Sequence, residues 1–242
     1  PQYFPSTPTV LPQYCQQYHR TPRRTIPVVN QYCHSTAHRT CPVGPLQCNC
    51  AIIADRLSLR ALVVDPGGDA DKIMSLINGL NLTVVAIIHT HAHLDHILAS
   101  GVIKEATGAP IFLHEEDKFL WDMVGEQCAR FGLPSITLPE PDSFIKDDQA
   151  LNCCGGVAIH TPGHSPGSTS FWFEEYKTLV AGDTLFQGSI GRTDLPGGNF
   201  DQIISSIKER IYCLDDEAIV VTGHGPNTSI ADEKTGNGFI RG

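Results

Sequence analysis

The pattern of apolar and polar positions from about residue 41 onward predicts strands that alternate with helices. Four short runs in the first half are apolar and mostly rich in β-branched residues, as is typical of strands, and they cover residues 50–54, 61–64, 82–88 and 110–113. The run 82–88 is apolar on both faces, which favours a strand buried inside a sheet. Helical spacing of apolar residues predicts three helices, at about 70–80 with Asp69 as the N-cap, at 94–105 and at 115–124.

The second half of the chain repeats the alternation. Strands are predicted at 156–160, 169–173, 178–181 and 218–221. A helix is predicted at 200–212, because four isoleucines recur there on one helical face. Strands with interspersed helices in both halves favour an α+β fold of stacked sheets covered by helices. A chain of 242 residues is long enough for one such domain and short for two.

Composition excludes some classes of partner. Hydrophobic residues make up 41% of the chain and charged residues 18%, and no apolar run reaches the 18 residues or so that a membrane span needs. The formal net charge of −9 argues against a broad basic surface for nucleic-acid phosphates. We therefore expect neither a membrane nor a nucleic acid as partner. The nine cysteines lack the spacing of a disulfide scaffold or of a zinc site, which favours a reducing compartment.

Residues 1–40 differ from the rest and are predicted to be an irregular extension. They are rich in Pro, Gln, Tyr, Thr and Ser, and the first acidic residue of the chain is Asp55. Leaders that lack acids and contain arginine are typical of transit peptides, although the prolines would interrupt an amphipathic helix. The expected location is the cytoplasm, or a mitochondrion or plastid if the extension is a transit peptide. Residues 41–242 are predicted to form the catalytic domain.

Histidines and an aspartate crowd the segment that follows the predicted strand 82–88. Its sequence is Thr-His-Ala-His-Leu-Asp-His, residues 90–96. A single histidine there would more often be a packed core residue. Several close imidazoles and a carboxylate, however, are costly to bury together unless a divalent cation binds them.

Three other predicted strands each end in a glycine-bounded turn with one residue able to bind metal. These residues are His164, Asp183 and His224. The glycines allow the backbone to turn sharply and to approach the site closely. Together with residues 90–96, the set contains five histidines and two aspartates. Such nitrogen and oxygen donors suit two borderline divalent ions, and we expect Zn²⁺, with Fe or Mn as alternatives.

The motif Thr-His-x-His-x-Asp-His, followed by a distant histidine, an aspartate and a final histidine, resembles the metallo-β-lactamase superfamily. Further stretches at 43–50, 182–186, 191–194 and 223–226 resemble its short, single-domain, glyoxalase II-like branch, and the resemblance covers about residues 41–240. It implies an αββα sandwich with the site at one edge of the sheets. It also implies that His91, His93 and His164 bind one metal ion. The second ion would be bound by Asp95, His96 and His224, and Asp183 would bridge the two.

The same resemblance implies hydrolysis of a hydroxyacyl-glutathione thioester. Two divalent ions about 3.5 Å apart can share a water and lower its pKa, and the resulting hydroxide would attack the thioester carbonyl. Catalysis would then depend on Asp95 and Asp183. Longer glyoxalase II enzymes bind glutathione through an additional helical domain, for which residues 225–242 offer no counterpart. Arg192 and Arg241 are the remaining candidates for contact with the substrate, and Arg192 could equally pair with Asp194.

Two alternatives remain open for the function. A persulfide dioxygenase of the same fold would use one iron held by His91, His164 and Asp183. A non-catalytic binding or scaffold protein is the other alternative, but such members lose ligands and all seven are present here. A nuclease is disfavoured by the acidic charge.

Several other residues receive weaker predictions. Three histidines are predicted to pack in the core or to orient a ligand, His89, His114 and His160. Phe119, Trp121 and Phe131 are candidates for the wall of a substrate groove. Asp65 is predicted to form a turn or to orient a ligand.

Overall fold

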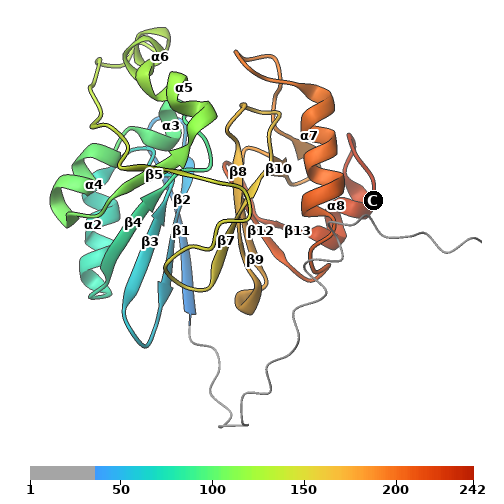
Figure 1. Cartoon of the computed structure of the whole chain (residues 1–242), viewed down its shortest axis with the longest axis horizontal. Coiled ribbons are helices and arrows are strands. Elements are labelled where there is room, and N and C mark those ends of the chain that lie inside the picture. Colours follow the sequence, from blue (N-terminus) through green and yellow to red (C-terminus); the bar gives the residue numbers. More distant parts are fainter. Residues whose placement is uncertain (1–35) are drawn as a thin grey trace, which may run out of the picture.

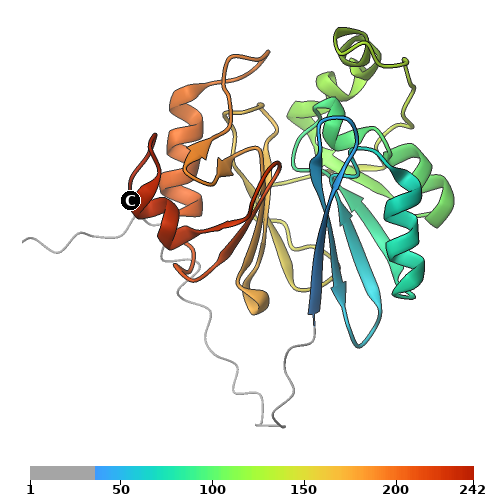
Figure 2. The same cartoon turned by 180° about the vertical axis from the view of Figure 1, so that it is seen from behind.

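The computed structural model describes residues 36–242 and forms four layers, with helices on the outside and two sheets inside (Figures 1 and 2). The predicted αββα sandwich is confirmed. Within the described part, no helix combines the length and apolarity needed to cross a bilayer.

The first sheet contains six strands in sequence order. β1 to β3 pair antiparallel, and β3 to β6 pair parallel. The strands are β1 (Thr36–Val43), β2 (Cys48–Asp55), β3 (Arg60–Val64), β4 (Thr83–Ile88), β5 (Ile111–His114) and β6 (Ser143–Ile145). The helical segments of this half are α2 (Ala70–Gly79), α3 (Leu94–Ile97), α4 (Ser100–Thr107), the 3-10 turn η1 (Glu115–Asp117), α5 (Lys118–Asp122) and α6 (Val124–Arg130).

The second sheet has the order β13-β12-β9-β8-β7, with only β12 and β9 parallel. Its strands are β7 (Gly156–His160), β8 (Thr169–Phe173), β9 (Thr178–Gly182), β12 (Ile219–Thr222) and β13 (Thr228–Ser229). A separate hairpin contains β10 (Leu185–Phe186) and β11 (Ser189–Ile190). The helical segments are η2 (Glu174–Tyr176), α7 (Phe200–Ser206), its π-helical continuation η3 (Ile207–Ile211) and α8 (Ile230–Gly236).

Three apolar clusters hold the layers together. Between the sheets, Ile53 and Leu62 of the first sheet pack with Phe171 and Phe173 of the second. A second cluster joins the other face of the first sheet to its helices, and a third joins the second sheet to α7, η3 and α8. Strands buried on both faces explain why runs such as 82–88 are apolar throughout.

The order of elements follows the predicted alternation, but some boundaries differ. β1 begins at Thr36, so the predicted boundary near residue 41 falls inside a strand whose residues 36–40 pair with residues 51–55 of β2. The rest of the predicted extension lies outside the described residues. The helix predicted at 94–105 is two helices, because the chain turns at Ala99, whose N–H donates to Pro66 O instead of continuing the first helix.

Two helix starts also differ in detail. Residues 115–124 contain a 3-10 turn and the short helix α5, and α6 follows at once. Asp69 does occupy the N-cap position of α2, but with a left-handed φ of 45° and no side-chain cap bond. Its Oδ2 instead accepts from the N–H of Gly44, in the turn between β1 and β2.

Candidate metal centre

The seven side chains that the sequence singles out lie together at one end of the two sheets. Four lie on the segment that follows β4 and runs into α3, namely His91, His93, Asp95 and His96. The other three follow strands of the second sheet, His164 after β7, Asp183 after β9 and His224 after β12. Segments more than 120 residues apart therefore meet because their strands end at the same edge.

Three histidines form the first group. The Nε2 atom of His164 lies 2.9 Å from Nδ1 of His93 and 3.2 Å from Nε2 of His91. Nδ1 of His91 contacts Thr90 Oγ1, whose proton goes to Asp65, and Nδ1 of His164 contacts the carbonyl of Arg192. Both Nδ1 atoms must then donate, which places the lone pairs on the two facing Nε2 atoms. Two lone pairs at this distance repel each other unless a cation lies between them.

The second group consists of Asp95, His96 and His224. Asp95 Oδ2 lies 3.0 Å from His224 Nε2 and 3.7 Å from His96 Nε2. Nδ1 of His224 contacts the carbonyl of Leu46, and Nδ1 of His96 contacts Asp65. Both rings therefore direct Nε2 toward Asp95.

Asp183 lies between the two groups. Its Oδ1 is 3.4 Å from His96 Nε2 and 3.8 Å from His224 Nε2, in the second group. Its Oδ2 is 3.6 Å from His164 Nε2, in the first. One carboxylate thus presents an oxygen to each group.

The donor set fits divalent cations. Within residues 36–242, His96 Nε2 and Asp183 Oδ1 are buried polar atoms without a hydrogen-bond partner, and leaving such atoms unsatisfied is costly. Imidazole nitrogens and carboxylate oxygens are the ligands that zinc, iron and manganese accept. The arrangement therefore has the chemistry and the unsatisfied atoms of a metal centre.

Protonation states favour ligation as well. Burial, and then the neighbouring His96 and His164, hold the pKa of His91 well below its ordinary value, and burial and His164 lower the pKa of His93 to about 3. Burial opposes ionisation of Asp183, but the nearby His96, His164 and His224 together outweigh it and lower the pKa of the carboxyl. His91 and His93 are thus neutral and the Asp183 carboxylate is ionised, as metal binding requires.

Asp65 orients two of the histidines. Its carboxylate is 2.9 Å from His96 Nδ1, and it accepts from the N–H of Thr90 at 2.7 Å and from the Thr90 hydroxyl at 2.6 Å. Thr90 in turn contacts His91. The sequence predicts that Asp65 either forms a turn or orients a ligand, and the structure supports both roles. Asp65 contacts the ring of His96 and also has a turn conformation, with a φ of 52°.

Asp117 is a second buried carboxylate beside the centre, and the sequence analysis does not predict its role. It accepts from the N–H of Ala92 at 3.0 Å, from the Ser165 hydroxyl at 2.8 Å and from the N–H of Gly167 at 2.6 Å. It thereby joins the loop of His91 and His93 to the loop of His164. In the sequence, Asp117 stands directly after the strand β5, in an acidic run that resembles an ordinary exposed surface.

Glycines are required where the backbone contacts the ligands. A Cβ on Gly223 would lie 1.9 Å from Asp183 Oδ1, and a Cβ on Gly67 would lie 1.5 Å from the carbonyl oxygen of Asp95. Gly182 has a φ of 52° and packs against Thr90. The predicted close approach of the backbone to the site is confirmed at Gly182 and Gly223, and Gly67 is a further position of this kind.

A groove of about 230 Å³ opens onto the centre, with His93, Asp95, His164 and Asp183 in its lining. Arg192 lines it too, but its guanidinium makes two 2.7 Å bonds to Asp194, and its carbonyl contacts His164. Among the aromatic candidates, only Phe131 lines the groove. Trp121 is buried in the core, with its N–H donating to Pro139 O. Phe119 and Arg241 are not part of this lining.

The three histidines with weaker predictions, His89, His114 and His160, lie outside the groove lining. His89 is fully buried between Phe112 O and Ser100 Oγ, which matches a packing role. His114 and His160 stack on each other with ring centroids 4.1 Å apart. Cys48 lies 3.4 Å from His96 Nδ1, but burial raises the pKa of its thiol to about 12, so it is a neutral packing group there.

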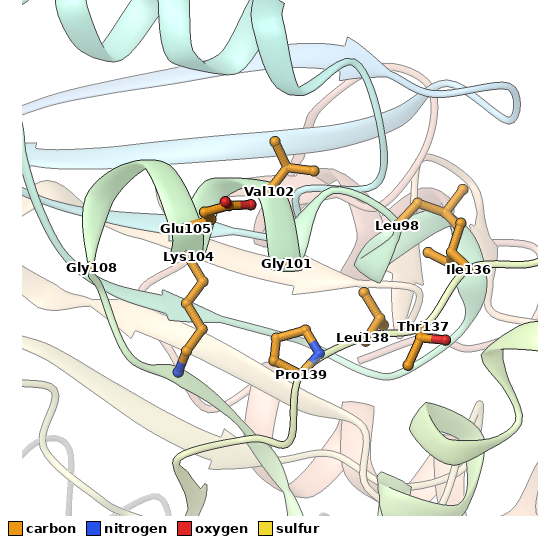
Figure 3. A pocket seen from close by; sticks show the side chains of 10 residues that line it. All are labelled: Leu98, Gly101, Val102, Lys104, Glu105, Gly108, Ile136, Thr137, Leu138 and Pro139. Atoms are coloured by element: carbon orange, nitrogen blue, oxygen red, sulfur yellow. The ribbon is translucent and has the colours of Figure 1, made fainter.

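A larger hollow of about 680 Å³ lies away from the seven side chains, between α4 and the segment 136–139 (Figure 3). The ring of Pro139 faces Gly101 across it, and Leu138 and Leu98 contribute apolar surface. None of the seven candidate metal ligands lines this hollow. Its larger volume therefore does not mark the position of the metal centre.

Comparison with known proteins identifies the family. The sequence profile of the metallo-β-lactamase superfamily matches residues 43–224. The chain belongs to this superfamily of metallo-hydrolases. It is 39% identical over 198 residues to the hydroxyacylglutathione hydrolase GloC of Haemophilus influenzae, covering 80% of this chain and 93% of that protein.

Two solved structures of the superfamily resemble it in fold. The BLEG-1 B3 metallo-β-lactamase has a TM-score of 0.80 at 36% identity, over 85% of this chain and all of that one. TTHA1623 in a di-iron-bound form has a TM-score of 0.78 at 34% identity, over 84% of this chain and all of that one.

Proposed function

We propose that the chain is a two-metal thioester hydrolase that cleaves a hydroxyacyl-glutathione. His91, His93 and His164 hold one divalent ion, Asp95, His96 and His224 hold the other, and Asp183 bridges them. The observation that carries the proposal is the position of Asp183, whose two oxygens face different groups of ligands.

The bound ions would supply an activated water and polarise the acyl carbonyl. The protein's own residues hold this centre in place. Asp65 and the carbonyls of Arg192 and Leu46 fix the ring orientations, and such partners strengthen and orient ligand histidines. Asp117 keeps the two ligand loops together.

A thioester suits this site because a thiolate leaves more easily than an alkoxide or an amine, and so needs little help from a general acid. Every histidine of the centre has its Nδ1 or its Nε2 directed at the other ligands, so none is placed as a free acid in the groove. The named activity of the Haemophilus relative supports the same choice of substrate.

Zinc is the proposed ion, with iron or manganese as alternatives. The di-iron form of TTHA1623 supports iron as a competitor, since it shares 34% identity with this chain. Imidazole and carboxylate ligands do not by themselves select among these metals.

A substrate panel tests the proposal. Protein reconstituted with zinc, iron or manganese is assayed on S-lactoylglutathione by release of glutathione, on glutathione persulfide by oxygen uptake, and on a cephalosporin by ring opening. The proposal expects turnover of the thioester above the other two by at least a hundredfold in kcat/KM. Oxygen uptake on persulfide as the main activity would make the mono-iron dioxygenase the function. Cephalosporin hydrolysis as the main activity would make the protein a β-lactamase.

A further inference from the structure

One face of α6 forms a wall of the groove above the metal centre. Met123, Glu126, Gln127 and Arg130 all line it, and their spacing of three, one and three residues places them on one side of the helix. Leu195 and Pro196, in the loop that leads into α7, also line the groove. In Figure 1 this loop and α6 stand at the same end of the molecule, on its two halves.

The wall is fixed relative to the ligands. Val124 and Cys128 are buried on the other side of α6, in the cluster beneath the helices. The Gln127 side chain accepts from the N–H of Leu94 at 2.9 Å and donates to the carbonyl of Ala92 at 3.1 Å. Because Leu94 and Ala92 flank His93, the groups on this face keep a set position beside the metal centre.

Two side chains of opposite charge on this wall form no ion pair within the described residues. Arg130 and Glu126 are one helical turn apart, a spacing at which ion pairs commonly form. Neither makes an ion pair with any charged residue within 36–242, whereas Arg192 on the lining is paired to Asp194. The groove thus offers one free cation and one free anion, both exposed and both on α6.

We infer that Arg130 and Glu126 form a subsite for the zwitterionic amino-acid end of a peptide-type thiol carrier, with Arg130 binding its carboxylate and Glu126 its ammonium group. The choice of ligand rests on the proposed thioester hydrolysis. In glutathione, the γ-glutamyl end carries both charges on one carbon, which matches two opposite charges one turn apart. Glu126 and Arg130 both line the groove of about 230 Å³ that opens onto the centre, so the carrier of a thioester bound there enters the groove that these two side chains border.

Arg130→Ala tests the subsite by comparing two substrates. S-lactoylglutathione carries the zwitterionic end, and S-lactoyl-N-acetylcysteamine carries no charge. The KM for the glutathione thioester should rise about tenfold with kcat within twofold, as expected for loss of an exposed charged hydrogen bond. Kinetics on the neutral thioester should not change. Arg130→Lys should recover part of the loss, and Glu126→Gln should raise the KM for the glutathione thioester alone by a smaller factor.

Arg56→Ala is the matched control, because Arg56 is exposed in the turn between β2 and β3, outside the groove. Metal content should be the same in all variants. An equal loss on both substrates, or no loss on either, would overturn the subsite.

A binding measurement separates this inference from the proposed reaction. S-methylglutathione cannot be hydrolysed as a thioester, and its Kd is measured by calorimetry for the wild type and Arg130→Ala. A Kd that rises about tenfold supports the subsite even if the wild type hydrolyses no thioester, in which case only the proposed function fails. An unchanged Kd, or no binding by the wild type, contradicts the subsite whatever the reaction is.

Discussion

Asp183 Oδ1 lies 3.4 Å from His96 Nε2, and neither buried atom has a hydrogen-bond partner within the described chain. At this distance, a carboxylate and an imidazole would ordinarily rotate so that the ring N–H donates a hydrogen bond to the carboxylate oxygen. Here Asp65 holds His96 from the other ring nitrogen, and the second oxygen of Asp183 faces His164. Both side chains are therefore fixed in an arrangement that a bound cation would satisfy.

Asp183→Asn should remove metal from both groups. The amide keeps the shape but loses the charge that stabilises two cations, so the number of ions retained after gel filtration should fall below one per chain, and kcat should fall at least a hundredfold. The control is Asp216→Asn, an exposed aspartate that pairs with Lys234. A variant that retains both ions and its activity would contradict the bridging role.

Asp65→Asn tests the orientation of His96 and Thr90. Asparagine tolerates the left-handed backbone of this position, so the fold should persist. The negative charge facing His96 is lost, and metal affinity should fall about 10- to 100-fold. Titration with a competing chelator measures the affinity directly. Unchanged affinity would show that Asp65 serves only the turn.

Gly223→Ala should disrupt the centre by steric overlap, since its Cβ would lie 1.9 Å from Asp183 Oδ1. We expect loss of at least one ion per chain while circular dichroism stays native. Gly236→Ala is the matched control, because nothing lies within 4 Å of a Cβ there, and an alanine in a helix is favourable. Equal metal content in the two variants would refute the close-packing argument.

His89 should make the metal-free protein less stable in acid. Burial lowers the pKa of His89 from 6.5 to about 4. Between these pH values His89 is protonated in the unfolded chain and neutral in the folded chain. This contribution to stability is fully present above pH 6.5 and is lost as the pH falls toward 4. In His89→Gln the difference in the free energy of unfolding between pH 7 and pH 5 should be smaller than in the wild type, by urea denaturation in the presence of chelator. An identical pH dependence would contradict it.

Much of the fold and of the centre could be predicted from the sequence because each depends on local patterns. Strands such as Thr83–Ile88 are long and apolar, and the motif 90–96 places four candidate ligands within six residues. His164, Asp183 and His224 were found because glycine turns mark the ends of their strands. The structure brings all seven together, while their assignment to two ions stays a proposal.

Other features depend on contacts between distant segments and leave little local signal. β10, β11 and β13 have two residues each, too few for a periodic pattern, and α8 begins directly after β13. Asp117 sits in an acidic run, and only its three bonds to the ligand loops show what it does. The groove face of α6 could not be found either, because it is defined by loops from the other half of the chain.

The most direct test of the central claim is a titration of the metal-free protein with zinc, with hydrolysis of S-lactoylglutathione measured at each step. A two-ion centre bridged by Asp183 predicts that activity rises until two equivalents per chain are bound and then stays constant. Full activity at one equivalent, or two bound zinc ions with no thioester turnover, would contradict the account.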